Sequence, residues 1–158
     1  QLQARAQVDG RRIGLVGGSK GAELALVAAA KMPWVQAVVG CVPSDVVWAG
    51  YGREPAPGEL LSSWSWQGRP LPFIAYDRYE DVFAGRASAA QVHARSRAKA
   101  TTEVVRAARI PVERIRAPVL LIAGGKDQVW PSESMAAAIG KAMGRRAEVL
   151  SFPAAGHG

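Results

Sequence analysis

A serine flanked by glycines is the residue best suited to chemistry in this sequence. The segment Gly17-Gly18-Ser19-Lys20-Gly21 fits the pattern G-x-S-x-G, in which a strained turn between a strand and a helix exposes the serine hydroxyl as a nucleophile. The backbone N–H of Lys20 would then point at the oxyanion formed when the serine attacks a carbonyl. The alternative is a glycine-rich nucleotide-binding turn, but neither G-x-G-x-x-G nor a Walker A sequence is present here.

A serine nucleophile needs a base, and the chain has only two histidines, His93 and His157. His157 stands between Gly156 and Gly158, just after an apolar segment with the character of a strand. His93 stands in an Ala- and Arg-rich stretch with a helical pattern, so we expect it on the surface of a helix. We therefore expect His157 to be the base.

The base needs an acid to orient it, and Asp127 follows the apolar segment 117–124 closely. As an alternative, Asp127 only stabilises its loop through an Asx-turn. Asp45, which follows the apolar segment 35–42, is the rival acid. We favour Asp127 as the acid. The resulting chain order Ser19, Asp127, His157 is the order found in α/β-hydrolases.

The elements that would position these residues are strands and helices in alternation. Short apolar runs predict buried parallel strands, and Ala-rich stretches between them predict crossover helices. The expected strands are 11–17, 35–42, 117–124 and 147–152, and the expected helices are 20–32 and 132–143, with Pro131 at the first helical position. The fold class is α/β, a partial α/β-hydrolase fold of about four parallel strands from the nucleophile strand onward.

The middle of the chain, residues 43–116, is less regular. Its Gly, Pro and aromatic residues indicate loops or a short hairpin, and residues 87–108 have a helical pattern. Trp48, Trp64 and Trp66 are candidates for an acyl pocket, or else ordinary anchors of the core and loops.

Composition narrows the class of protein. The chain has 158 residues, of which 49% are hydrophobic and 21% charged, as in one globular domain. No apolar run approaches the roughly 20 residues of a membrane helix. Cys41 is the only cysteine, so there is no internal disulfide and no Cys/His cluster for a metal. The net charge of +7 comes from scattered basic residues without a nucleic-acid motif.

Beyond its α/β pattern, the sequence resembles the C-terminal catalytic domain of the acyl-CoA thioesterase and bile acid-CoA:amino acid N-acyltransferase family. The resemblance runs along nearly the whole chain, and the sequences Ser-Lys-Gly-x-Glu-Leu and Ile-Pro-Val-Glu within it are more discriminating than G-x-S-x-G. The matching stretches are 13–26, 68–72, 110–115, 125–133 and 156–157.

The resemblance implies that Ser19, Asp127 and His157 form a catalytic triad. Thioesterases of this family usually have serine at the nucleophile and the transferase has cysteine, so Ser19 favours hydrolysis. The family's domain has strands before the nucleophile strand, and one of their loops supplies the second oxyanion donor. We therefore expect residues 1–158 to form a single α/β-hydrolase-like domain that lacks the upstream half of the sheet and the C-terminal helix, and that is a weak catalyst alone.

The expected function is a serine hydrolase that cleaves acyl-CoA thioesters to the free acid and CoA through an acyl-serine intermediate. The alternatives are a general carboxylic-ester or peptide hydrolase of the same fold, or a non-catalytic fragment. We expect no metal or organic cofactor, a small-molecule acyl substrate, no nucleic-acid partner and no membrane span. The sequence leaves a homo-oligomer open, and a cytoplasmic location is the default expectation.

Overall fold

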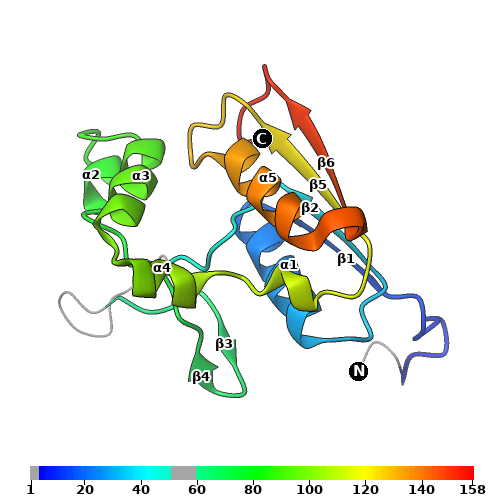
Figure 1. Ribbon diagram of the computed structural model, residues 1–158. Coiled ribbons are helices and arrows are strands. Elements are labelled where there is room, and N and C mark those ends of the chain that lie inside the picture. Colours follow the sequence, from blue (N-terminus) through cyan, green and yellow to red (C-terminus); the bar gives the residue numbers. More distant parts are fainter. Residues whose placement is uncertain (1–3, 51–59) are drawn as a thin grey trace.

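One parallel sheet of four strands organises the structure, a computed structural model that describes residues 4–50 and 60–158 (Figure 1). The strand order is β1-β2-β5-β6, and each neighbouring pair is parallel. The strands are β1 (Gly14–Gly18), β2 (Ala37–Cys41), β5 (Val119–Gly124) and β6 (Ala147–Phe152). Because all four run in one direction, their carboxyl ends lie at one edge of the sheet. The predicted parallel α/β class is confirmed.

Two crossover helices connect the strands in pairs. Helix α1 (Lys20–Lys31) joins β1 to β2, and α5 (Ser132–Met143) joins β5 to β6. The predicted spans 20–32 and 132–143 agree with these helices within one residue. Pro131 was expected inside α5 but is its N-cap, with φ −76° and ψ 69°, because its ψ is not helical.

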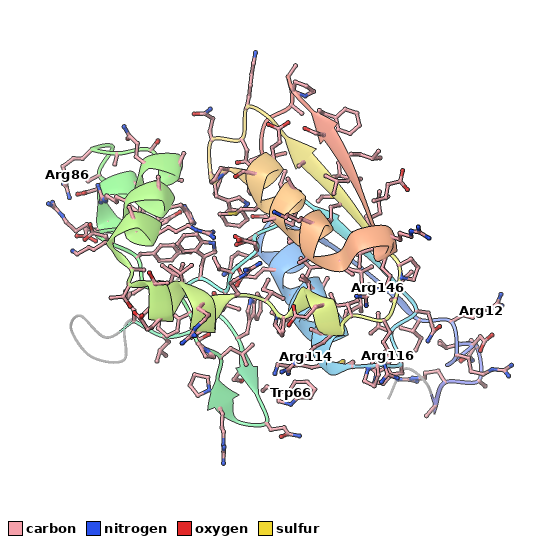
Figure 2. All side chains as sticks on the ribbon, in the orientation of Figure 1. Arg12, Trp66, Arg86, Arg114, Arg116 and Arg146 are labelled. Carbon is pink, nitrogen blue, oxygen red and sulfur yellow. The ribbon has the colours of Figure 1, made fainter. Side chains whose placement is uncertain are left out.

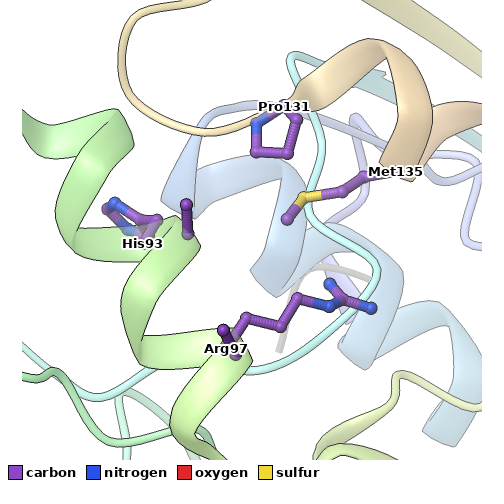
Figure 3. A pocket seen from close by; sticks show the side chains of 6 residues that line it. His93, Arg97, Pro131 and Met135 are labelled. Atoms are coloured by element: carbon purple, nitrogen blue, oxygen red, sulfur yellow. The ribbon is translucent and has the colours of Figure 1, made fainter.

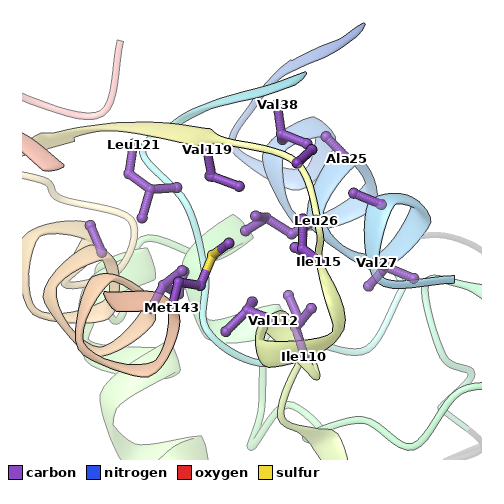
Figure 4. Close-up of a cluster of buried hydrophobic side chains, with 14 of the residues drawn as sticks. Ala25, Leu26, Val27, Val38, Ile110, Val112, Ile115, Val119, Leu121 and Met143 are labelled. Carbon is purple, nitrogen blue, oxygen red and sulfur yellow. The ribbon is translucent and has the colours of Figure 1, made fainter. Parts of the chain in front are cut away.

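The hydrophobic core fills the space between the sheet and these two helices. Leu26 of α1, Leu121 of β5 and Ile139 of α5 are buried in one cluster with Ile115, which follows the 3-10 helix η2 (Val112–Arg114) (Figure 4). Burying a side chain of this size contributes about 2 kcal/mol. This packing fixes α1 against the sheet, with the amino end of the helix at the carboxyl edge of the strands.

The other face of the sheet is apolar and more open. Val16, Val39 and Leu120 are register partners on neighbouring strands. Val16 is 79% exposed, and β1 is an edge strand of this sheet. A parallel sheet normally has both faces covered, so this face is unusual for its class in the part of the chain that the structure describes.

The segment between β2 and β5 forms a hairpin and three helices. Strands β3 (Ser65–Trp66) and β4 (Arg69–Pro70) enclose Gln67 and Gly68, whose positive φ values of 51° and 76° suit a tight hairpin turn. The helices that follow are α2 (Glu80–Phe83), α3 (Ala89–Lys99) and α4 (Thr102–Ala108).

The expected helical stretch 87–108 is thus two helices rather than one. Ser88 and Gln91 form a capping box at the start of α3, and Thr101 caps α4 through the N–H of Val104. The chain bends at Ala100, where φ is −68° and ψ is 138°. In residues 4–50 and 60–158, no helix has the length and apolarity to cross a bilayer.

Candidate active site

The turn after β1 presents Ser19 in a strained conformation. Its φ of 54° and ψ of −123° are rarely adopted by a residue other than glycine, and its N–H donates to the carbonyl of Cys41 at 2.9 Å. A Cβ atom at Gly17 would lie 2.1 Å from the carbonyl oxygen of Gly21. Only glycine therefore fits at Gly17, and the turn lifts the Ser19 side chain to the carboxyl edge of the sheet.

Three side chains meet at this edge, each from a different strand end. His157 Nε2 lies 2.7 Å from Ser19 Oγ, and His157 Nδ1 lies 2.8 and 2.9 Å from the two carboxylate oxygens of Asp127. With Nδ1–H donated to the carboxylate, Nε2 is left to accept the hydroxyl proton of Ser19. The structure therefore brings Ser19, His157 and Asp127 together as one hydrogen-bonded chain.

The loops after β5 and β6 are held against each other, which positions His157. The N–H of Lys126 donates to the carbonyl of Ala155 at 2.9 Å, and that of Gly125 donates to Phe152 at 3.0 Å. A Cβ at Gly124 would lie 2.3 Å from the carbonyl oxygen of Gly156, so the close approach requires glycine.

The carboxylate of Asp127 is almost completely shielded from water, with a side chain 1% exposed. Burial by itself raises the pKa of Asp127. Hydrogen bonds outweigh it, above all those from Ser132, from the N–H of Val129 at 2.8 Å and from His157, so the net pKa is lowered. Asp127 is therefore a fixed negative charge beside the imidazole.

Trp130 contacts both Asp127 and His157, although no role was predicted for it from the sequence. Its backbone N–H donates to Asp127 at 3.2 Å, and its indole meets the His157 ring edge to face with centroids 5.0 Å apart. The indole N–H donates to the carbonyl of Val42 at 3.1 Å. Val42 has a φ of 43°, which is strained for a β-branched residue. Only the position of Trp130, three residues after Asp127, pointed to it in the sequence.

His93 is buried, and the expectation of a surface position was wrong. It lies in α3 as expected, but it is 1% exposed and packs edge to face on the rings of Trp48, Tyr76 and Trp130. Its Nδ1 lies 2.9 Å from the carbonyl oxygen of Ala89. Burial lowers the pKa of His93 to about 4, so the ring is neutral near neutral pH.

Asp45, the rival acid, is engaged elsewhere. It is 6% exposed, and its carboxylate receives two hydrogen bonds from the Arg97 guanidinium, at 2.6 and 2.8 Å. These bonds raise the pKa of Arg97. Arg97, Pro131 and Met135 line a cavity of about 300 Å³. Figure 3 shows these side chains. Asp45 thus links the loop after β2 to α3.

Glu23 forms a second buried polar cluster directly behind the nucleophile turn. Its Oε1 accepts hydrogen bonds from Lys20 Nζ and Trp64 Nε1, both at 2.7 Å, and from the N–H of Trp48 at 3.3 Å. Burial raises the pKa of Glu23 and lowers that of Lys20, whereas their mutual attraction acts in the opposite direction on each. Glu23 lies in the sequence Ser-Lys-Gly-x-Glu-Leu, but no role was predicted for it.

The three tryptophans that were candidates for an acyl pocket lie in three different environments. Trp48 is fully buried in the core, Trp64 bonds to Glu23, and Trp66 lies in the hairpin with Lys31 Nζ 5.3 Å from its ring. None of the three is among the residues that line the cavity next to Arg97 and Met135. In residues 4–50 and 60–158, no cluster of three or more His, Cys, Asp or Glu is arranged to hold a metal ion.

Solved structures of other proteins have a similar fold. Acetyl xylan esterase 1 from Thermoanaerobacterium sp. matches with a TM-score of 0.57 at 22% identity, over 99% of this chain and 44% of the esterase. Acylaminoacyl peptidase from Pyrococcus horikoshii matches with a TM-score of 0.59 at 15% identity, over 99% of this chain and 22% of the peptidase. The chain spans less than half of either protein, and its fold is that of the α/β-hydrolases.

The family follows from the sequence itself. Residues 1–158 match the family described as BAAT / Acyl-CoA thioester hydrolase C terminal, and the chain belongs to that family. No curated protein matches the sequence.

Proposed function

We propose that this protein is a serine hydrolase that cleaves acyl-CoA thioesters into the free acid and CoA. The observation that carries the proposal is the hydrogen-bonded chain Ser19–His157–Asp127, with 2.7 Å between hydroxyl and imidazole and 2.8 Å between imidazole and carboxylate. A nucleophile, a base and an orienting acid at these distances are what acyl transfer to serine requires. Membership of the family supports the choice of an acyl-CoA substrate.

In the first half of the reaction, Ser19 Oγ attacks the thioester carbonyl while His157 Nε2 takes the hydroxyl proton. The negative charge on the carbonyl oxygen is stabilised by the backbone N–H of Lys20 at the amino end of α1. Breaking the C–S bond leaves an acyl-Ser19 ester, and the imidazolium returns its proton to the departing CoA sulfur.

In the second half, His157 takes a proton from water, and the resulting hydroxide attacks the acyl-Ser19 carbonyl. The carboxylic acid leaves and Ser19 Oγ recovers its proton from His157, so the enzyme is regenerated. Asp127 accepts the Nδ1–H bond throughout, which fixes the tautomer of His157 and stabilises its positive form.

A hydrolase of carboxylic esters or peptides is the second candidate. The similar solved structures, an acetyl xylan esterase and an acylaminoacyl peptidase, favour it. The same three residues would act in the same order, and only the leaving group would differ, an alcohol or amine in place of a thiol.

Steady-state kinetics on the full-length protein test both candidates. We expect turnover of acyl-CoA, measured by release of free thiol, and its loss in Ser19→Ala. Good turnover of p-nitrophenyl esters with none of any acyl-CoA would replace the thioesterase by the second candidate. Turnover of neither substrate by the folded protein would favour the non-catalytic alternative.

A further inference from the structure

A groove of about 220 Å³ lies beside the carboxyl-terminal half of α1, away from the nucleophile turn. Its floor is apolar and comes from several segments. Val27 belongs to α1, Val47 to the loop after β2, Leu71 to the residues after the hairpin, and Ile110 to the link between α4 and η2. A flat, apolar part of a ligand could therefore pack against this floor.

The rim of this groove is basic. Lys31, Arg109 and Arg114 line it, and no acidic side chain does. Arg97 and Arg95 bind carboxylates elsewhere in the fold. By contrast, no ion pair or side-chain hydrogen bond involves Arg109 or Arg114 within the described residues. We name this feature, with its apolar floor and three cations, the basic groove.

An aromatic segment runs along α1 from the nucleophile turn to the basic groove. At one end, Trp64 donates to Glu23 and lies under Lys20, whose Nζ is 5.6 Å from the ring centroid. At the other end, Trp66 lies under Lys31, with Nζ 5.3 Å from its ring; Figure 2 labels Trp66 and Arg114.

The nucleophile turn and the basic groove lie at opposite ends of α1, so the length of this helix gives the distance between them. Lys31 follows Ser19 by twelve residues, which corresponds to about 18 Å along an α-helix. A ligand that occupies both the nucleophile turn and the basic groove must therefore be long, with its reactive carbonyl at one end and its anionic group at the other.

We propose that the basic groove binds the phosphorylated nucleotide of a CoA thioester while the acyl carbonyl lies at Ser19. Arginine guanidinium groups bind phosphate oxygens in pairs, and lysine adds a point charge. The apolar floor suits the adenine ring, and the flank formed by Trp64 and Trp66 suits the flexible arm that connects nucleotide and thioester. The inference rests on the proposed function and selects acyl-CoA over simple esters as the substrate.

Two thioesters with the same acyl group test the assignment on the full-length protein. Acyl-CoA carries the nucleotide, and the corresponding N-acetylcysteamine thioester lacks it. Since each charge-assisted contact to phosphate is strong, the double variant Arg109→Ala/Arg114→Ala should raise the KM for acyl-CoA about tenfold or more. The kcat, and both constants for the truncated thioester, should stay as in the unmodified protein.

The matched control removes the same charge elsewhere. Arg5 and Lys141 are exposed and do not line the basic groove, so Arg5→Ala/Lys141→Ala should leave the KM for acyl-CoA unchanged. A second measurement is calorimetric binding of adenosine 3′,5′-bisphosphate to Ser19→Ala protein, which should weaken about tenfold in the groove variant because phosphate contacts are lost.

Equal KM values or equal bisphosphate affinities in the groove variant and the control would overturn the assignment. Hydrolysis of neither thioester would instead overturn the proposed function. In that case the calorimetric comparison decides on the groove independently, because binding needs no turnover.

Discussion

The imidazole of His157 and the indole of Trp130 meet edge to face, with an interplanar angle of 87° and ring centroids 5.0 Å apart. Trp130 also holds Asp127 through its backbone N–H and holds the end of β2 through the carbonyl of Val42. One residue thus connects a strained strand end to the base and acid of the proposed triad. We therefore expect Trp130 to be a positioning residue for the proposed reaction.

Replacing Trp130 should therefore lower kcat with little change in KM. Trp130→Phe keeps a ring beside His157 but loses the hydrogen bond to Val42, and we expect kcat to fall about tenfold. Trp130→Leu removes the ring contact as well, and misplacing the base by about 1 Å should cost about 100-fold. The measurement is steady-state hydrolysis of acyl-CoA.

The control for this series is Trp34→Leu, because Trp34 is 39% exposed and distant in sequence from the site. Its kcat should match that of the unmodified protein. If Trp130→Phe and Trp130→Leu were as active as Trp34→Leu, the positioning role would be wrong.

Replacement by Asn should lower kcat at Asp127 but lower the stability of the fold at Asp45. Asp127→Asn leaves the wrong tautomer of His157 in place, so kcat should fall about 10⁴-fold. Asp45→Asn removes the partner of Arg97 and should leave kcat nearly unchanged. It should instead lower the free energy of unfolding by about 2 kcal/mol, less than for a fully buried pair because Arg97 is partly solvated.

Kinetics and urea denaturation on both variants give the comparison. A large loss of kcat in Asp45→Asn, with Asp127→Asn active, would exchange the roles assigned to the two carboxylates.

The pair Lys20–Glu23 should show strong coupling in a double-mutant cycle. Lys20→Met leaves a carboxylate in the interior without a counter-ion and should cost about 3 kcal/mol of unfolding free energy. Glu23→Gln keeps the acceptor for Trp64 but leaves Lys20 unpaired. The double variant is neutral at both positions and should be more stable than the sum of the single changes predicts.

Lys20→Met should also change the dependence of stability on pH. Lys20 lowers the pKa of Glu23, and burial raises it, so removing Lys20 raises the Glu23 pKa further. A folded-state pKa above the unfolded one gives stability at low pH that is lost as pH rises through the folded value. Additive effects in the cycle, with no such loss on going to higher pH, would contradict a coupled pair.

His93 should make the protein less stable in acid. Its pKa is about 4 in the folded state and 6.5 for the free side chain, so the unfolded chain binds the extra proton between these values. The contribution is complete above pH 6.5 and decreases as pH falls toward 4, by about 3 kcal/mol at most. His93→Phe should remove this part of the slope, as measured by denaturation at several pH values. The same slope in both proteins would show that His93 does not titrate in this way.

Sequence reasoning succeeded where one local signal was enough. The apolar runs predicted β1, β2, β5 and β6, and the Ala-rich stretches predicted α1 and α5, because each pattern lies within a single element. The positions of Ser19, Asp127 and His157 just after strand ends also predicted their meeting, since parallel strands bring those ends to one edge.

Contacts between distant side chains that do not lie at strand ends could not be predicted in this way. His93 is buried because Trp48, Tyr76 and Trp130 surround it, and these come from three separate parts of the chain. Glu23 meets Trp64 across 41 residues. The break between α3 and α4 depends on capping by Thr101, which the composition of residues 87–108 did not reveal.

The most direct test of the central claim is the site and rate of labelling by a fluorophosphonate, read by peptide mass spectrometry of the folded full-length protein. The label should be found on Ser19 and should form about 1,000-fold more slowly, or not at all, in His157→Gln, because the base then no longer takes the hydroxyl proton. Labelling of another residue, or an equal rate on Ser19 in both proteins, would contradict the account.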